Sequence, residues 1–145
     1  MRVLLISFFV CSMTAAFGQH KDIVEWSGAF DRENQTINIK ADIKGKWVIY
    51  SQFTDPEGPI PLEFEFEPAD GVTLDGDVAE LTEVIEEHSE MFGVTVRKFK
   101  SEATFAQVLK SGWKPGQVIK SHVTYMACND ELCLPPETVT FDVKL

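Results

Sequence analysis

Two cysteines near the end of the chain, Cys128 and Cys133, are the residues best suited to chemistry. Four residues, 129–132, separate them, and a Leu-Pro-Pro-Glu segment follows at 134–137. The third cysteine, Cys11, lies in an N-terminal segment that we expect to be removed. In an oxidising compartment, Cys128 and Cys133 are expected to form a disulfide, either as a passive cross-link or as a working redox couple.

The short spacing of the pair makes it a weak cross-link. A disulfide needs Cα atoms roughly 5.5 to 6 Å apart, so the intervening residues Asn129 to Leu132 must form a tight turn. Closing a ring of about six residues contributes only about 2 kcal/mol in the chain-entropy model. This small value favours exchange chemistry. The structural alternative stays open, because cysteine pairs in small exported domains are more often structural.

The charges beside the cysteines are negative. Asp130 and Glu131 lie between them, Glu137 follows, and the nearest basic residue upstream is Lys120. Negative neighbours disfavour a thiolate, so we expect both thiol pKa values to exceed the ordinary value of about 8.5. The disulfide can still be attacked by a partner's thiolate. The expected behaviour is that of a carrier that reacts when it is docked to a partner.

Other kinds of site find little support in the sequence. A metal site needs three or four ligands, and the two cysteines with distant His88 and His122 form no recognisable set. We therefore predict neither a metal nor another cofactor. The chain has 13 basic and 23 acidic residues and a formal net charge of −10, which argues against binding to nucleic acid or to anionic membranes.

Residues 1–18 have the pattern of a signal peptide. Arg2 precedes a short apolar run at 3–10, and small residues then predict cleavage before Gln19. The apolar run is shorter than the roughly 20 residues that a spanning helix needs. A lipid-modified Cys11 is a disfavoured alternative. We expect a mature protein in the periplasm or outside the cell, with no membrane span.

The mature chain, residues 19–145, is expected to be one domain made of strands. Apolar and polar residues alternate with a period of two, which is typical of strands with one buried face. The predicted strands cover 37–43, 47–50, 62–67, 94–99, 103–109, 118–127 and 139–145. Turn-forming residues separate them, so we predict an all-β fold, an antiparallel β-sandwich.

The acidic segment 77–90 is ambiguous. Val78, Leu81, Val84 and Ile85 have the spacing of one face of a helix, within a stretch that could also be a strand running into a loop. Both alternatives are kept.

The residues around the cysteines resemble a known family. The segment 123–138, with a tyrosine before the first cysteine and Pro-Pro-Glu-Thr after the second, resembles the active-site hairpin of the N-terminal periplasmic domain of the thiol:disulfide interchange protein DsbD. Segment 45–50 is similar to the family's glycine-aromatic-x-x-tyrosine strand. Segment 89–93 is similar to its cap loop, which covers the disulfide. The resemblance extends over about residues 24–145.

The resemblance implies an immunoglobulin-like sandwich with a redox pair at one end. Cys133 would form the mixed disulfide with a partner, and Cys128 would be the resolving thiol. Tyr50, Tyr125 and Pro135 would line the site, with plain strand packing as the alternative for the tyrosines. The cap would consist of Glu90, Met91, Phe92 and Gly93. The family most often has an aromatic residue at the cap position, and whether Met91 or Phe92 covers the sulfurs stays open.

The implied activity is that of a thiol:disulfide oxidoreductase of the protein-disulfide reductase type. Electrons would pass from a membrane-anchored, thioredoxin-like donor to periplasmic thioredoxin-fold clients, without a cofactor. The family domain is usually fused to membrane helices, which are absent from this sequence, so a separate donor polypeptide and a monomeric carrier are expected.

The rival hypothesis is a secreted binding module with a purely structural hairpin disulfide. Trp26, Trp47 and Trp113 could then form a ligand surface, although most aromatic residues in a sandwich belong to its core.

Overall fold

The computed structural model describes residues 23–145, so the predicted signal peptide and Cys11 lie outside the described residues. Within this range the chain is all-β: it forms strands and no helix, and consequently contains no helix that could cross a membrane. The strands are β1 (Val24–Asp31), β2 (Thr36–Ile43), β3 (Val48–Tyr50), β4 (Glu63–Glu67), β5 (Thr73–Glu80), β6 (Ile85–Ser89), β7 (Val94–Lys100), β8 (Glu102–Ser111), β9 (Val118–Tyr125), β10 (Ala127–Cys128) and β11 (Glu137–Lys144).

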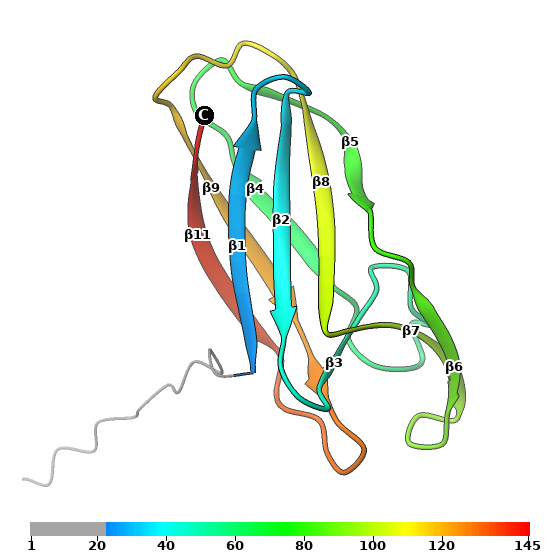
Figure 1. The fold of residues 1–145 in the computed structure, drawn as a ribbon. Helices are drawn as coiled ribbons and strands as arrows, with labels where there is room; N and C mark the ends of the chain where they lie inside the picture. Colours follow the sequence, from blue (N-terminus) through cyan, green and yellow to red (C-terminus); the bar gives the residue numbers. More distant parts are fainter. Residues whose placement is uncertain (1–22) are drawn as a thin grey trace, which may run out of the picture.

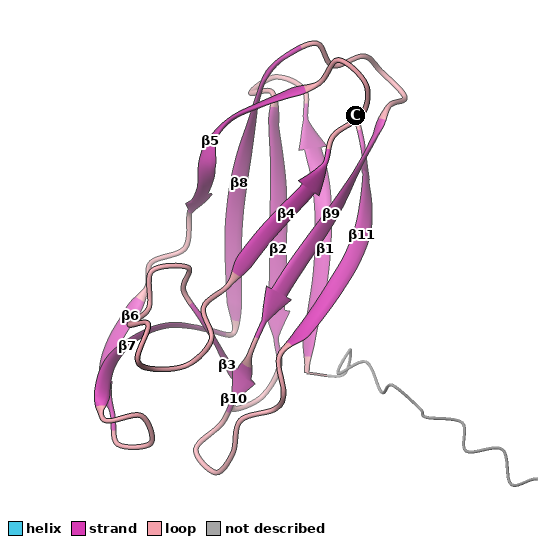
Figure 2. Ribbon diagram, turned by 180° about the vertical axis from the view of Figure 1, so that it is seen from behind, coloured by secondary structure: helices cyan, strands magenta, loops and turns pink. Residues whose placement is uncertain are grey.

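The strands form two facing sheets and a third, smaller sheet at one end (Figures 1 and 2). The first sheet has the order β1-β2-β8-β5, and the facing sheet has the order β11-β9-β4. The small sheet has the order β10-β3-β7-β6, and every pairing among the described strands is antiparallel. The predicted immunoglobulin-like sandwich is confirmed.

Alternating residues build the core between the two large sheets. In β2, Ile37, Ile39, Ala41 and Ile43 are all buried, and their neighbours in sequence are more exposed. The centre is aromatic, with Phe105 fully buried against neighbouring rings from other strands. The period of two therefore predicts the buried faces correctly, because each strand has one side against the core and one side toward solvent.

The segment 77–90 is strand and loop, so the helical alternative is wrong. Residues 77–80 belong to β5 and residues 85–89 to β6, with a loop between them, and Glu90 begins the next turn. Of the four residues with helical spacing, Val78 is buried, whereas Leu81 and Ile85 are 57% and 41% exposed. The helical spacing does not correspond to a common buried face, and pairing of β5 with β8 and of β6 with β7 determines the conformation instead.

The strand β1 was not among the predicted strands. Its inward positions include Gly28, which hides the alternation because glycine carries no side chain. A Cβ atom at Gly28 would lie 2.6 Å from Cε2 of Phe141 and 2.7 Å from Cγ2 of Val143. Glycine is needed here because β1 and β11 approach closely at the edge of the sandwich.

Glu80, the last residue of β5, connects the sandwich to the small sheet through hydrogen bonds. Its carboxylate accepts hydrogen bonds from the Ser51 hydroxyl at 3.0 and 2.9 Å and from the Gln52 amide at 2.8 Å. Ser51 is fully buried and follows β3 directly. These charge-assisted bonds position β3, which is the strand that pairs with the first cysteine.

Candidate functional site

Cys128 and Cys133 form a disulfide across a tight hairpin at the end of the sandwich away from the C-terminus (Figure 1). Their Cα atoms are 4.0 Å apart. The Asn129 amide donates to the carbonyl of Leu132 at 2.9 Å, and the Asn129 side-chain oxygen accepts from the amides of Glu131 and Leu132, each at 2.9 Å. The predicted turn over 129–132 is confirmed, and the Asn129 side chain holds it closed.

The two sulfur-bearing residues differ in exposure. Cys128 is only 2% exposed, because β10 pairs with β3 and places its side chain beside Tyr50 and Val96. Cys133 lies after the turn and is partly exposed. An incoming thiolate therefore has better access to Cys133 than to Cys128.

The small sheet is a platform beneath the disulfide. Val48 and Tyr50 of β3 line its site-facing groove together with Val96 and Lys98 of β7, whereas Ile49, between the first two, faces the main core. The cysteine hairpin rises from one edge of this sheet, at β10, and the β6–β7 hairpin rises from the other edge. Two hairpins far apart in sequence therefore meet over one sheet.

The tip of the β6–β7 hairpin covers the disulfide. Met91 Sδ lies 3.5 Å from Cys133 Sγ, and Met91 is 50% exposed. Phe92 points to the platform instead, where its ring meets Tyr50 edge-on with centroids 6.1 Å apart. Met91 is thus the residue that touches the exposed sulfur, and Phe92 anchors the tip. Gly93 closes the turn by donating its amide to Ser89 at 2.7 Å.

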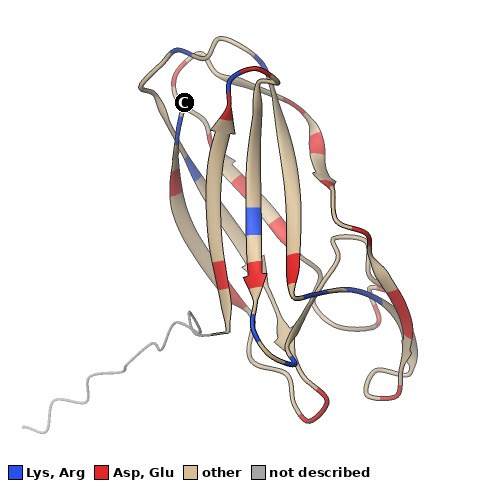
Figure 3. Cartoon of the chain, viewed as in Figure 1, with Lys and Arg blue, Asp and Glu red and all other residues tan. Residues whose placement is uncertain are grey.

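A groove of about 260 Å³ lies between the two hairpins, and its rim carries three carboxylates and two lysines. Glu87 and Glu90 contribute from the cap side, and Asp130 contributes from the cysteine side. Red segments at both hairpin tips show this distribution (Figure 3). Lys98 pairs with Glu87 at 3.0 Å, and Lys46 also lines the groove, so the carboxylates outnumber the lysines by one.

Three predicted residues lie at different distances from the sulfurs. Tyr50 packs directly against Cys128. Tyr125 belongs to the main core, next to Trp26, and its hydroxyl donates to Glu137 at 3.2 Å. Pro135 is exposed on the connection to β11. Roles for Tyr125 and Pro135 in the site remain predictions.

Sequence reasoning missed the groove residues that come from the platform. Lys46, Val48, Glu87, Val96 and Lys98 line the groove but were not among the candidates. Alternation along β3 indicates that Val48 shares a face with Tyr50. Glu87 and Lys98 become neighbours only through the β6–β7 pairing, which has no local signal in the sequence.

The two tyrosines, which are the only ones in the chain, offer a test of this arrangement. Burial, followed by the charge of Glu87, raises the pKa of Tyr50 from 10.0 to about 12. Burial, followed by the charge of Glu137, also raises the pKa of Tyr125. A raised pKa contributes stability that is present below pH 10 and is lost as the pH rises toward the folded pKa values. We therefore expect no tyrosinate absorbance at 295 nm in the folded protein until the pH is well above 10.

The control for this titration is the same protein in concentrated guanidinium chloride, where both groups should titrate near pH 10. Tyr50→Phe removes one of the two folded-state transitions. A folded-state titration centred on pH 10 would contradict the packing of both tyrosines.

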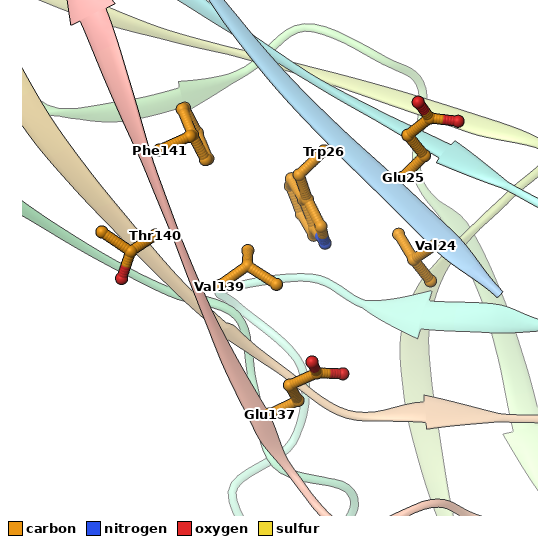
Figure 4. Close-up of a pocket in the computed structure, with 7 residues that line it drawn as sticks. All are labelled: Val24, Glu25, Trp26, Glu137, Val139, Thr140 and Phe141. Carbon is orange, nitrogen blue, oxygen red and sulfur yellow. The ribbon is translucent and has the colours of Figure 1, made fainter. Parts of the chain in front are cut away.

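A second pocket lies away from the disulfide, at the seam between β1 and β11. It encloses about 290 Å³ and is drawn in Figure 4. Its lining residues are Val24, Glu25, Trp26, Glu137, Val139, Thr140 and Phe141. Trp26 stacks on Phe105, and all three tryptophans are partly buried against the main core, as expected for most aromatic residues of a sandwich.

Comparison with known proteins agrees with this geometry. The sequence model of the family "Thiol:disulfide interchange protein DsbD, N-terminal" matches residues 20–145. No curated protein sequence matches the chain.

Solved structures with the same fold include two from Neisseria meningitidis. The DsbD N-terminal domain in its reduced form matches with a TM-score of 0.63 and 19% identity, over 88% of this chain and 90% of that chain. The complex of the DsbD N-terminal and PilB N-terminal domains matches with a TM-score of 0.60 and 20% identity, over 89% and 88%. The N-terminal periplasmic domain of ScsB from Proteus mirabilis has a TM-score of 0.58 and 13% identity, over 82% of this chain and 44% of that chain.

Proposed function

Because the chain belongs to the family of N-terminal domains of the thiol:disulfide interchange protein DsbD, we propose that it carries electrons by thiol–disulfide exchange through Cys128 and Cys133. The observation that carries the proposal is the unequal exposure of the pair. A bond with one buried and one accessible sulfur suits attack at a single defined atom.

The exchange proceeds in two halves. A donor thiolate attacks Cys133 Sγ, the S–S bond breaks, and Cys128 leaves as a thiolate that is then protonated. A second donor thiol attacks the donor sulfur of the mixed disulfide and releases Cys133, which leaves the domain reduced by two electrons. In the other half, the Cys133 thiolate attacks a client disulfide, and Cys128 then attacks Cys133 Sγ and releases the reduced client.

The cap would confer specificity through access. Met91 lies against Cys133, so an attacking sulfur must displace it. A docked protein can displace Met91 with its own contacts, whereas a small thiol gains little on displacing it. Glu90 and Gly93 complete the tip of the cap, where they would meet the partner first.

The partners are proposed from the family. The donor would be a membrane-anchored, thioredoxin-like domain, and the clients would be thioredoxin-fold proteins of the periplasm. Structural work on a DsbD N-terminal domain in complex with a PilB domain supports docking of such domains to other proteins. We place the action of residues 19–145 in the periplasm, as a monomer, after removal of residues 1–18.

The reduction potential of the cysteine pair tests the proposal. It is measured from alkylation mass shifts across a series of dithiol redox buffers. A value between about −200 and −270 mV is expected, in the range of exchange proteins. A value below about −300 mV would place the bond with structural disulfides and favour the binding module.

The small excess of carboxylates on the rim predicts a charge preference in the reaction with small thiols. A cationic thiol such as cysteamine should reduce the disulfide faster than anionic mercaptoacetate at low ionic strength, because Glu90 and Asp130 line the groove beside Met91 and outweigh the single positive charge of Lys46. The difference should shrink in 0.5 M salt, where screening is strong. Stopped-flow mixing monitored by thiol release gives the rates.

A control corrects for the different intrinsic reactivities of cysteamine and mercaptoacetate. The same rates are measured on the urea-unfolded protein, and the ratio in the folded state is divided by the ratio in the unfolded state. A corrected ratio near one at low salt would show that the rim does not act on the sulfur.

A further inference from the structure

We propose that the reduced cysteine pair and Met91 together bind a soft monovalent metal ion, Cu(I). The proposal rests on the proposed function in one respect, because exchange with a donor is what generates the two free thiols. It gives Met91 a second role, as a metal ligand, in addition to covering the disulfide.

Three sulfur atoms converge at the tip of the site. Cys128 Sγ and Cys133 Sγ are bonded to each other in the oxidised state, and Met91 Sδ lies 3.5 Å from Cys133 Sγ. Two sulfurs bound to one metal at about 2.3 Å each lie up to about 4.6 Å apart, so the observed separation suits shared ligands. After reduction, rotation about the Cα–Cβ bonds would separate the cysteine sulfurs while their Cα atoms remain close together.

The type of the donors selects the ion. Thiolate and thioether sulfurs are soft ligands that favour Cu(I), whereas Mg²⁺ and Ca²⁺ take oxygen ligands. A structural zinc site takes four ligands from cysteine, histidine and acidic residues. The described residues 23–145 contain no group of three such side chains that could hold a metal. Methionine supplies the third donor here, which suits copper better than zinc.

The surroundings suit a low-coordinate ion of this kind. Tyr50, Val96 and Phe92 form an apolar floor beneath the sulfurs, which limits access of water to the metal. Glu90 and Asp130 line the adjoining groove, where Lys46 is the opposing charge. Binding is a ligand exchange without electron transfer: the two thiols lose two protons, two thiolates and one thioether bind Cu(I), and the metal keeps its oxidation state.

Metal binding and electron transfer would exclude each other. A Cu(I) ion held by both thiolates blocks attack by Cys133 and prevents formation of the disulfide. A disulfide in turn offers no thiolate to the metal. The redox state of the domain would therefore control whether the ion is held or released, and bound Cu(I) would keep the pair reduced.

A competition titration tests the site. The mature protein is reduced chemically and freed of reductant without oxygen, and it then competes with bicinchoninate, a coloured Cu(I) chelator. We expect one Cu(I) per protein. We expect Met91→Leu to weaken binding about tenfold or more, equivalent to about 1.4 kcal/mol of binding free energy. Met126→Leu is the matched control: Met126 packs against the same buried cluster, and the thioether that touches Cys133 is that of Met91.

X-ray absorption of the copper-loaded protein gives a second readout. The wild-type spectrum should show three sulfur neighbours, and Met91→Leu should show two. Equal affinities for wild type and Met91→Leu, with two sulfur neighbours in both, would overturn the three-sulfur site. Preference for Zn²⁺ over Cu(I) would overturn the choice of metal. Because the titration uses chemically reduced protein, its failure leaves the metal-free reduction potential, and with it the carrier proposal, untouched.

Discussion

Replacing Cys133 with alanine is expected to abolish every covalent adduct between this protein and its redox partners. Cys128→Ala should instead cause one mixed disulfide to accumulate, because no internal thiol remains to resolve it. The asymmetry follows from burial: Cys128 is 2% exposed, whereas Cys133 is partly exposed under the cap. We expect nearly complete adduct formation with Cys128→Ala and almost none with Cys133→Ala.

Non-reducing electrophoresis after mixing with an oxidised thioredoxin-fold client measures the adducts, and mass spectrometry identifies the linked cysteines. The double variant is the control for non-specific adducts. If Cys133→Ala traps the partner and Cys128→Ala does not, the assigned roles are reversed. If neither variant forms an adduct with any thioredoxin-like donor or client, the carrier function is wrong.

Gly112→Ala is expected to destabilise the domain by about 3 kcal/mol or more, the largest effect that we predict for a single methyl group. Gly112 follows β8 and has a φ of +82°. A Cβ atom there would overlap the carbonyl oxygen of Gly71 and lie 2.8 Å from its carbonyl carbon. The substitution therefore strains the backbone at residue 112 and creates a clash with the turn at Gly71. The clashing atoms of Gly71 belong to the backbone, so they cannot rotate away as a side chain could.

The matched control is Gly116→Ala. Gly116 has a φ of +89°, but nothing lies within 4 Å of its added Cβ, so only the backbone strain of about 1 kcal/mol applies. Urea unfolding with the disulfide intact gives the two free energies of unfolding. Equal losses for both variants would show that the turns at Gly71 and Gly112 move apart easily.

The strands and the cysteine turn could be predicted from the sequence because their signals are local. Ile37, Ile39 and Ile43 lie on one face of β2, and burial of that face requires no knowledge of the partner strands. The turn at Asn129 is likewise local, since its side chain bonds to amides two and three residues on. Local patterns of this kind also support the family resemblance.

The rest of the site depends on pairing between distant segments. Met91 and Cys133 lie 42 residues apart in sequence. They meet because the hairpins that follow β6 and β10 rise from the two edges of one sheet and approach each other above it. The choice between Met91 and Phe92 as the cover could not be made from residue types, because both are apolar. In segment 77–90 the helical spacing was accidental, and strand pairing determined the outcome.

The cap hairpin separates the free energy of uncovering the disulfide from the free energy of unfolding the whole domain. Of the residues of β6, all but Ser89 are exposed, and β6 pairs with β7 alone. We therefore expect its tip to open by local unfolding, with loss of the contact between Phe92 and Tyr50 but not of the contacts among the buried residues of the two large sheets. Substitutions at the tip would tune how often the sulfur is uncovered, and substitutions in the core would tune how long the domain survives. Natural variation could adjust each property while leaving the other nearly constant.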